Sequence, residues 1–179
     1  TDAQVLTRTK GAGTYVAPPK YQSTLVEIRS IAEEIRARGH QHSAEVLTLE
    51  SIKATATLAH EMQLPVDSTV FHSCLLHHEN DQPVQYEERW VNPALAPDYL
   101  EQDFTQVTPN EYLVRVAPLQ RVEYRIEATL PNAAICQDLA MARGEPALLL
   151  HRRTWSLGTI AAVANLWHPG NRYQFTGHF

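Results

Sequence analysis

The stretch from Val70 to Pro93 most constrains the fold, because it holds two strand-like runs around Asn80-Asp81. The runs at 70–78 and 83–91 are rich in Val, Phe, Leu, Tyr and Trp, which favour strands. An Asn-Asp pair between two such runs is typical of a hairpin turn. The sequence therefore predicts an antiparallel β-hairpin with several polar side chains inside its strands.

The length of the turn decides which of these polar side chains share a face. If the loop is Asn80–Gln82, residues whose numbers sum to 162 lie opposite each other. His77 then faces Gln85, and Glu87 and Arg89 follow on the same face, because side chains alternate along a strand. A two-residue loop would instead turn Glu87 to the face opposite His77. Both registers remain open from the sequence alone.

The order of elements in this region recurs in the C-terminal half. In the first half, a strand at 43–50 and a helix at 55–63 precede the hairpin. In the second half, a strand at 122–130 and a helix at 132–141 precede two strands at 147–155 and 160–167. The two helices align at an offset of 77 residues, as Leu58 with Ile135 shows. Two strand–helix–hairpin units would form one antiparallel sheet with helices packed against it, so we predict an α+β fold.

Two further helices are predicted by capping boxes, in which a hydroxyl residue and a glutamate three residues later satisfy each other's backbone N–H groups. Ser30 and Glu33 form the first, and Thr108 and Glu111 form the second. Free N–H groups at a helix start also attract anions. Ser30 and Thr108 are therefore candidate ligand contacts, with simple capping as the alternative interpretation.

Composition and motif spacing argue against several classes of function. The net charge of −5 and the lack of a basic stripe make this chain alone a poor nucleic-acid binder. The sequence contains no Gly-x-Ser-x-Gly elbow and no reactive-cysteine setting, so it does not indicate an enzyme. It also lacks the Cys-x-x-Cys and His-Glu-x-x-His spacings that are typical of metal sites. We expect no cofactor. Cys74 and Cys136 lie in apolar patterns, which favours reduced thiols and a cytoplasmic location. No apolar run in the sequence approaches the roughly 20 residues that span a membrane.

The polar residues of the hairpin suit recognition of a small ligand better than catalysis. Arg89 offers a guanidinium that grips a carboxylate, and Glu87 accepts hydrogen bonds from a ligand N–H or O–H. His77 and Gln85 lie beside them in the first register. The alternative is a surface ion pair worth roughly 0–1 kcal/mol and without a ligand.

Several long segments resemble the histidine utilization repressors of the GntR superfamily. They are LVEIRSIAEEIRARGHQH, LLHHENDQPVQYEERWVNPALAPDYLEQDFT, TPNEYL, APLQ with VEYRIEATLP, and LLLHRRTWS with HPGNRYQF. The resemblance begins near Tyr21 and covers nearly all of the chain that follows. It implies a UTRA effector-binding domain with a chorismate lyase-like fold.

This resemblance also implies a function and a set of ligand contacts. Such repressors control histidine-degradation genes and leave operator DNA when urocanate binds. Relatives that bind sugar phosphates use positions that correspond here to Ser30, His77, Glu87, Thr108 and His168. His77 stands where relatives often have arginine, His168 stands where they have tyrosine, and Leu75 stands at a further position that is basic in relatives. The loss of cations favours urocanate, which is smaller and less charged than a sugar phosphate.

The same resemblance divides the chain into two parts. Residues 1–19 are expected to be the wing of a winged helix-turn-helix domain plus a linker, and residues 20–179 the UTRA domain. Operator DNA would then bind through an N-terminal domain missing from this chain, and a palindromic operator favours a homodimer. Two alternatives remain: a chorismate lyase-like enzyme and a plain dimerisation module.

Overall fold

The computed structural model describes residues 6–9, 13–16, 21–24 and 30–176. Strands β1 (Leu6–Thr9) and β2 (Gly13–Val16) form an antiparallel pair. Strand β3 (Tyr21–Thr24) pairs in parallel with β10 (Tyr173–Thr176). No helix in the described ranges is both long and apolar enough to cross a membrane.

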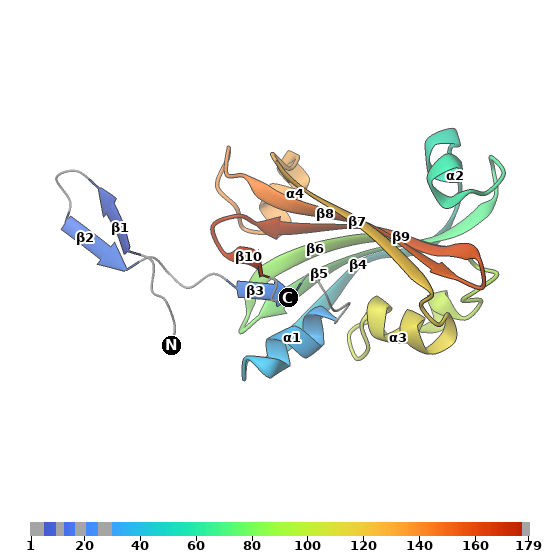
Figure 1. Ribbon diagram of the computed structural model, residues 1–179, viewed down its shortest axis with the longest axis horizontal. Coiled ribbons are helices and arrows are strands. Elements are labelled where there is room, and N and C mark those ends of the chain that lie inside the picture. Colours follow the sequence, from blue (N-terminus) through green and yellow to red (C-terminus); the bar gives the residue numbers. More distant parts are fainter. Residues whose placement is uncertain (1–5, 10–12, 17–20, 25–29, 177–179) are drawn as a thin grey trace.

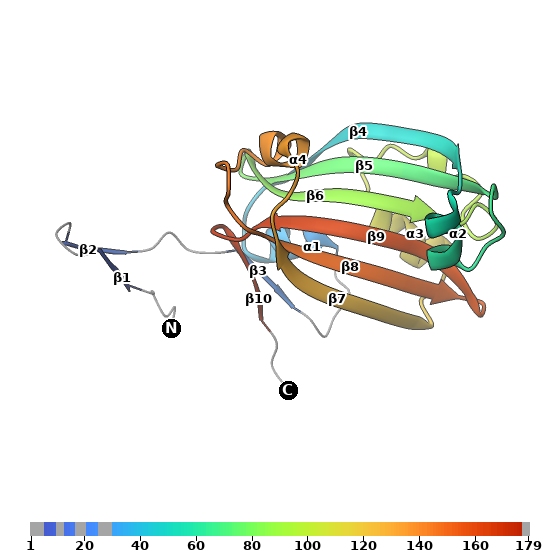
Figure 2. The same ribbon diagram turned by 90° about the horizontal axis from the view of Figure 1, so that it is seen from above.

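Six antiparallel strands form the main sheet in the order β4-β5-β6-β9-β8-β7 (Figure 2). Their bounds are β4 His42–Lys53, β5 Thr69–Glu79, β6 Gln82–Val91, β7 Arg121–Thr129, β8 Ala147–Ser156 and β9 Thr159–Pro169. The two predicted units meet where β6 pairs with β9 in the middle of the sheet. The predicted α+β fold and its internal repeat are therefore confirmed.

The helices cover the two faces of the sheet in pairs (Figure 1). Helices α2 (Ala56–Met62) and α4 (Ala133–Asp138), one from each unit, lie on one face. Helices α1 (Ile31–Ala37) and α3 (Pro109–Val116) lie on the other, with a short 3-10 helix, η1 (Tyr99–Glu101). The sheet thus has an α1/α3 face and an α2/α4 face.

Apolar side chains fix each helix to the sheet. Met62 of α2 packs with Val70 and Val163, and Leu113 of α3 packs with Leu75 and other residues of its cluster. The predicted helix over 132–141 is shorter than expected and ends at 138, and Ala140, just beyond it, adopts a positive φ of 49°.

The hairpin between β5 and β6 combines features of both registers considered above. Its turn has two residues, Asn80 and Asp81, with φ of 48° and 65°. A β-bulge at Val84 then adds one unpaired residue to β6, so that His77 lies opposite Gln85 and Leu75 lies opposite Glu87. The expectation that a two-residue loop separates Glu87 from His77 was therefore wrong, because the bulge restores the grouping.

Candidate functional site

The centre of the candidate site is a buried carboxylate, Glu87 on β6. Its Oε1 accepts a hydrogen bond from Nε of Arg89 at 2.6 Å, and its Oε2 lies 3.3 Å from Nε2 of His77. Nδ1 of His77 lies 3.0 Å from Nε2 of His42 on the neighbouring strand β4. Glu87, Arg89 and His77 are all buried, so three of the predicted residues form one connected polar network under α1 and α3.

The electrostatics of this network keep Glu87 ionised. Burial alone would raise the pKa of Glu87, but the charge of Arg89 and the hydrogen bond with His77 outweigh burial and hold the pKa well below its usual range. The pKa of His42 falls to about 4, chiefly because of burial and then because of the charge of His77. A buried anion and a neutral imidazole thus occupy the same part of the sheet.

Two buried arginines leave donors without a partner near this carboxylate. Among the described residues, Nη2 of Arg89 and Nε of Arg152 have no hydrogen-bond acceptor. Nη2 of Arg152 donates to Oδ1 of Asn110 on α3 at 3.1 Å. Burial and the charge of Arg89 lower the pKa of Arg152 to about 10, which still leaves it cationic near pH 7. Unpaired buried donors of this kind favour an anionic ligand.

A second polar pair lies on the same face, between β6 and β9. Nε2 of Gln85 donates to Nε2 of His168 at 2.8 Å, while Nδ1 of His168 lies 3.3 Å from the carbonyl of Leu148. Burial lowers the pKa of His168 to about 3, so this imidazole is neutral. Its ring lies against that of Tyr173, whose hydroxyl donates to Oε2 of Glu34 on α1 at 3.2 Å.

The two predicted capping boxes are present, and they bring the starts of α1 and α3 together. Ser30 and Thr108 accept from Glu33 and Glu111 at 3.1 and 3.2 Å, and each glutamate accepts the backbone N–H of its cap. Burial would raise the pKa of Glu111, but hydrogen bonds from Thr108 and Ser30 lower it. Nη1 of Arg36 on α1 donates to Oε1 of Glu111 on α3 at 3.4 Å, which links the two helices, and Ser30 and Thr108 are both buried.

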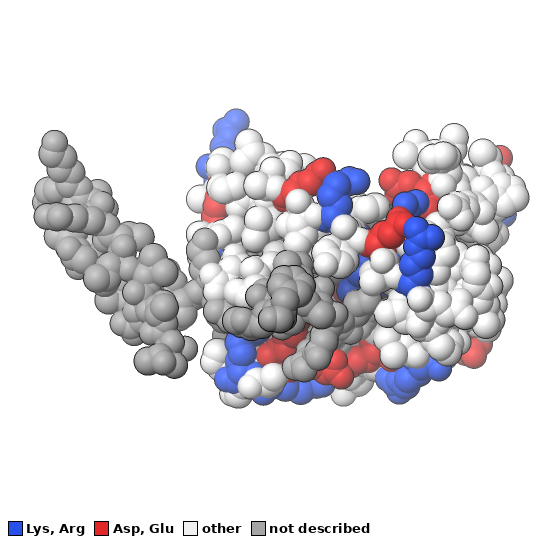
Figure 3. Space-filling model, in the orientation of Figure 1, with Lys and Arg blue, Asp and Glu red and all other residues white. Residues whose placement is uncertain are grey.

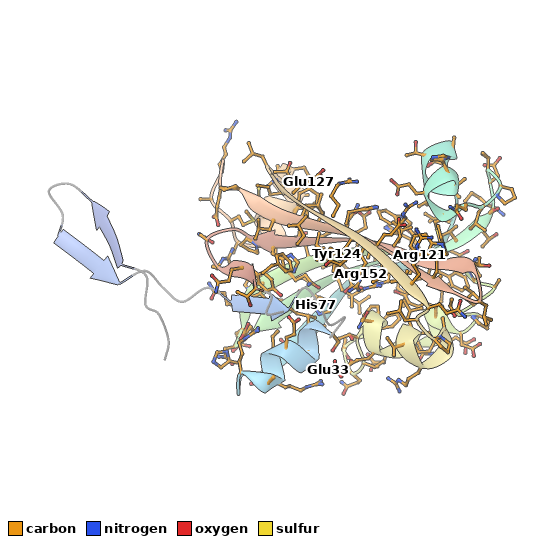
Figure 4. The ribbon with its side chains drawn as sticks, viewed as in Figure 1. Glu33, His77, Arg121, Tyr124, Glu127 and Arg152 are labelled. Atoms are coloured by element: carbon orange, nitrogen blue, oxygen red, sulfur yellow. The ribbon has the colours of Figure 1, made fainter. Side chains whose placement is uncertain are left out.

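The sheet network lies close to the starts of helices α1 and α3 (Figure 4). The labelled His77 lies near α1, and Arg152 lies farther along the sheet. His42 lies within electrostatic reach of both His77 and Glu111, so the sheet network and the helix starts are close to each other. Among the described residues, no hydrogen bond joins Ser30 or Thr108 directly to the sheet network.

Sequence reasoning did not select Arg152 as a site residue. In the internal repeat, Arg152 corresponds to Leu75, which lies 77 residues earlier. Leu75 pairs with Glu87, so the repeat indicated that Arg152 lies at the level of the candidate site.

On the face shown in Figure 3, basic and acidic side chains lie close to one another instead of forming one basic patch.

Comparison with known proteins identifies the family. The UTRA domain model matches residues 37–174. Histidine utilization repressors from Pseudomonas aeruginosa and Klebsiella aerogenes are 49% and 48% identical to the chain over 98% and 100% of its length, which corresponds to 70% and 74% of theirs. The chain belongs to the histidine utilization repressors of the GntR superfamily.

Solved structures of related domains have the same fold. The C-terminal domain of the histidine utilization repressor from Pseudomonas syringae superposes with a TM-score of 0.75 at 45% identity, covering 78% of this chain and 99% of that one. PhnF from Mycobacterium smegmatis gives a TM-score of 0.84 at 22% identity, over 97% of this chain and 77% of PhnF. The resemblance inferred from the sequence segments is thus confirmed, and the relatives at 48% and 49% identity are named as repressors.

Proposed function

We propose that this UTRA domain binds urocanate between the sheet and helices α1 and α3, and that binding makes the whole repressor release operator DNA. The observation that carries the proposal is the buried network of Glu87, His77 and Arg89, together with the unpartnered donors of Arg89 and Arg152. Urocanate combines one carboxylate with one imidazole. The network offers cations for the first group and hydrogen-bonding partners for the second.

The carboxylate of urocanate is assigned to the two guanidinium groups. Arg89 uses Nε for Glu87 and retains Nη2, and Arg152 uses Nη2 for Asn110 and retains Nε. A carboxylate that accepts from both would satisfy two buried donors at once. The starts of α1 and α3 are less suitable than expected, because the carboxylates of Glu33 and Glu111 already accept N–H groups there.

The imidazole ring of urocanate is assigned to the remaining predicted residues. Glu87 accepts from a ring N–H, and His77 or the Gln85–His168 pair bonds the second ring nitrogen. Ser30 and Thr108 then act by holding α1 and α3 at the edge of the site. The site therefore comprises Ser30, His77, Gln85, Glu87, Arg89, Thr108 and His168, with Arg152 added.

Release of DNA requires that urocanate bind the DNA-incompetent arrangement more tightly than the competent one. We propose that residues 1–19 belong to the DNA-binding wing and linker, and that two copies act on a palindromic operator in the cytoplasm. The names of the relatives support the repressor role.

Calorimetric titration with urocanate tests the proposed site. We expect Arg152→Gln to weaken binding roughly 10- to 100-fold, since a hydrogen bond to a charged group contributes about 1.5–3 kcal/mol. Arg153→Gln is the matched control, because Arg153 points to the other face of β8 and pairs with Glu123. Histidine and imidazolepropionate test the specificity for the ligand.

Three results would count against the proposal. They are an absence of heat with urocanate, equal losses of affinity in the Arg152 and Arg153 variants, and unchanged affinity in both Glu87→Gln and His77→Gln. Thermal unfolding of each variant shows whether it is folded under the conditions of the titration. Operator release is tested on the full-length repressor by a DNA-binding assay with and without urocanate.

A further inference from the structure

A second cluster of functional side chains lies on the α2/α4 face of the same hairpin. We propose that His72, Cys74 and Glu88 form a binding site for Zn²⁺ or a similar divalent transition-metal ion. The ligand atoms of these residues all lie within 4.8 Å of one another. This inference is independent of the proposed urocanate site, which uses the opposite face of β5 and β6.

Two distances within the cluster are close to those around a tetrahedral metal, and the ligand atoms of Cys74 and Glu88 lie within 4.8 Å of each other. Nε2 of His72 lies 3.6 Å from Sγ of Cys74 and 3.1 Å from Oε1 of Glu88. Bond lengths of about 2.0–2.3 Å in a tetrahedral zinc site place a nitrogen and a sulfur ligand about 3.6 Å apart, and a nitrogen and an oxygen ligand about 3.3 Å apart. A small shift of the Glu88 side chain would therefore allow all three atoms to coordinate one ion.

The pairing of the two strands brings these ligands together. Cys74 on β5 lies directly opposite Glu88 on β6, and His72 precedes Cys74 by two residues on the same face. Strands in the interior of a sheet hold side chains more firmly than loops do. The three ligands are thus placed by the ladder between β5 and β6 rather than by a loop.

The surroundings of His72 also resemble those of a metal-binding histidine. Its second ring nitrogen, Nδ1, lies 3.4 Å from Oε1 of Glu50 on β4, and a carboxylate in this position commonly orients a histidine ligand. The ring of Trp90 is stacked on that of His72 with centroids 5.6 Å apart. Both contacts fix the ring so that Nε2 points towards Cys74 and Glu88.

The set of donor atoms indicates which ions fit. One imidazole, one thiolate and one carboxylate suit zinc or cobalt better than the oxygen-preferring Mg²⁺ or Ca²⁺. Three protein ligands leave a fourth position for water or another ligand. The Glu88 side chain is 29% exposed, which gives an ion a route to the buried thiol of Cys74. An ordinary ion pair between His72 and its two glutamates would not require the thiol.

Cobalt titration of chelator-treated protein tests the site, because a thiolate bound to Co²⁺ gives a charge-transfer band in the near ultraviolet. We expect one equivalent of Co²⁺ to produce this band and Zn²⁺ to remove it. Cys74→Ser should abolish the band, whereas Cys136→Ser should retain it, since Cys136 lies on α4 outside the cluster. Glu50→Gln should keep the band and weaken metal binding about 10- to 100-fold.

The outcomes separate the metal site from its alternatives. Absence of the band in the wild-type protein overturns the proposal, as does a band that survives Cys74→Ser. A band lost only in Cys136→Ser would assign the metal to a different place. Far-ultraviolet circular dichroism of each variant confirms that loss of the band does not arise from unfolding.

Discussion

At the scale of single residues, the fold concentrates charge where apolar side chains would be expected. Glu87 is buried on a central strand, and its neighbours Arg89 and His77 are buried with it. Desolvation of such a group is costly, so its partners compensate for burial without adding net stability. Removing one partner leaves the other charge buried and unpaired.

We therefore predict that Glu87→Gln strongly destabilises the domain. The loss should be about 3–5 kcal/mol, because the guanidinium of Arg89 then lacks its carboxylate. Urea unfolding measures this difference. Glu127→Gln is the control, since Glu127 is exposed on β7 and pairs with Arg125 at the surface, and its loss should stay within about 1 kcal/mol. Equal losses would show that the buried network is not electrostatically coupled.

The buried neutral imidazole of His168 makes a prediction about pH. Its folded pKa of about 3 lies below its ordinary value of 6.5, so its contribution to stability is complete above pH 6.5 and is lost as the pH falls towards 3. His168→Gln should remove a dependence of about 1.4 kcal/mol per pH unit between pH 6 and 4. Urea unfolding at several pH values measures the slopes, and His60→Gln, on the exposed side of α2, is the control. Identical slopes in the wild-type and His168→Gln proteins would contradict the prediction.

At the scale of elements, the helix starts were predictable and the hairpin register was not. A capping box is a local pattern, so Ser30 with Glu33 and Thr108 with Glu111 were predicted correctly. Pro83 beside the bulge is a local signal, since proline inside a sheet is confined to edges, strand starts and bulges, but Val84 also packs against α1 and Tyr173, which come from distant parts of the chain. The grouping of His77 with Glu87 therefore needed the tertiary structure, although the residues themselves were selected from the sequence.

Capping at α3 gives a prediction for a single element. Thr108→Ala should reduce stability by about 1 kcal/mol, since the N–H of Glu111 loses its acceptor. Thr108→Ser retains a hydroxyl oxygen and should restore most of the loss. Melting temperatures of the three proteins measure both effects. An equal loss in Thr108→Ser would assign the effect to the methyl group of Thr108 and its packing.

The ligand cluster at His72, Cys74 and Glu88 shows a limit of motif searches. Metal motifs with short sequence spacing describe helices and loops, whereas this cluster combines neighbours on one strand with a residue from the strand beside it. Its only signature is the register of the hairpin, and that register depends on the bulge. Arg152 needed the structure for a similar reason, since it reaches Asn110 on a helix from another part of the chain.

At the scale of the whole molecule, the two repeat units share their core. Val70 of the first unit packs in the same cluster as Trp155, Ile160 and Val163 of the second. Neither unit can therefore bury its apolar face alone. We predict a single cooperative unfolding transition for residues 30–176, with coincident loss of secondary structure and of tertiary packing.

Circular dichroism in the far and near ultraviolet during one thermal scan measures this cooperativity. Coincident curves support the shared core, and calorimetric and van't Hoff enthalpies should agree. Val163→Ala should shift both curves together to lower temperature by the same amount. Two separate transitions, or a shift in only one of the curves, would show that the units unfold independently.

The parallel pairing of β3 with β10 links distant parts of the sequence in a way that bears on signalling. Tyr173, the first residue of β10, contacts the ring of His168 and the carboxylate of Glu34, and the backbone of the same strand holds Tyr21–Thr24. A displacement of a few ångströms at that tyrosine would pass directly to β3 through the parallel pairing. This pairing would couple the surroundings of His168 and Glu34 to residues 21–24, which precede α1 in the sequence.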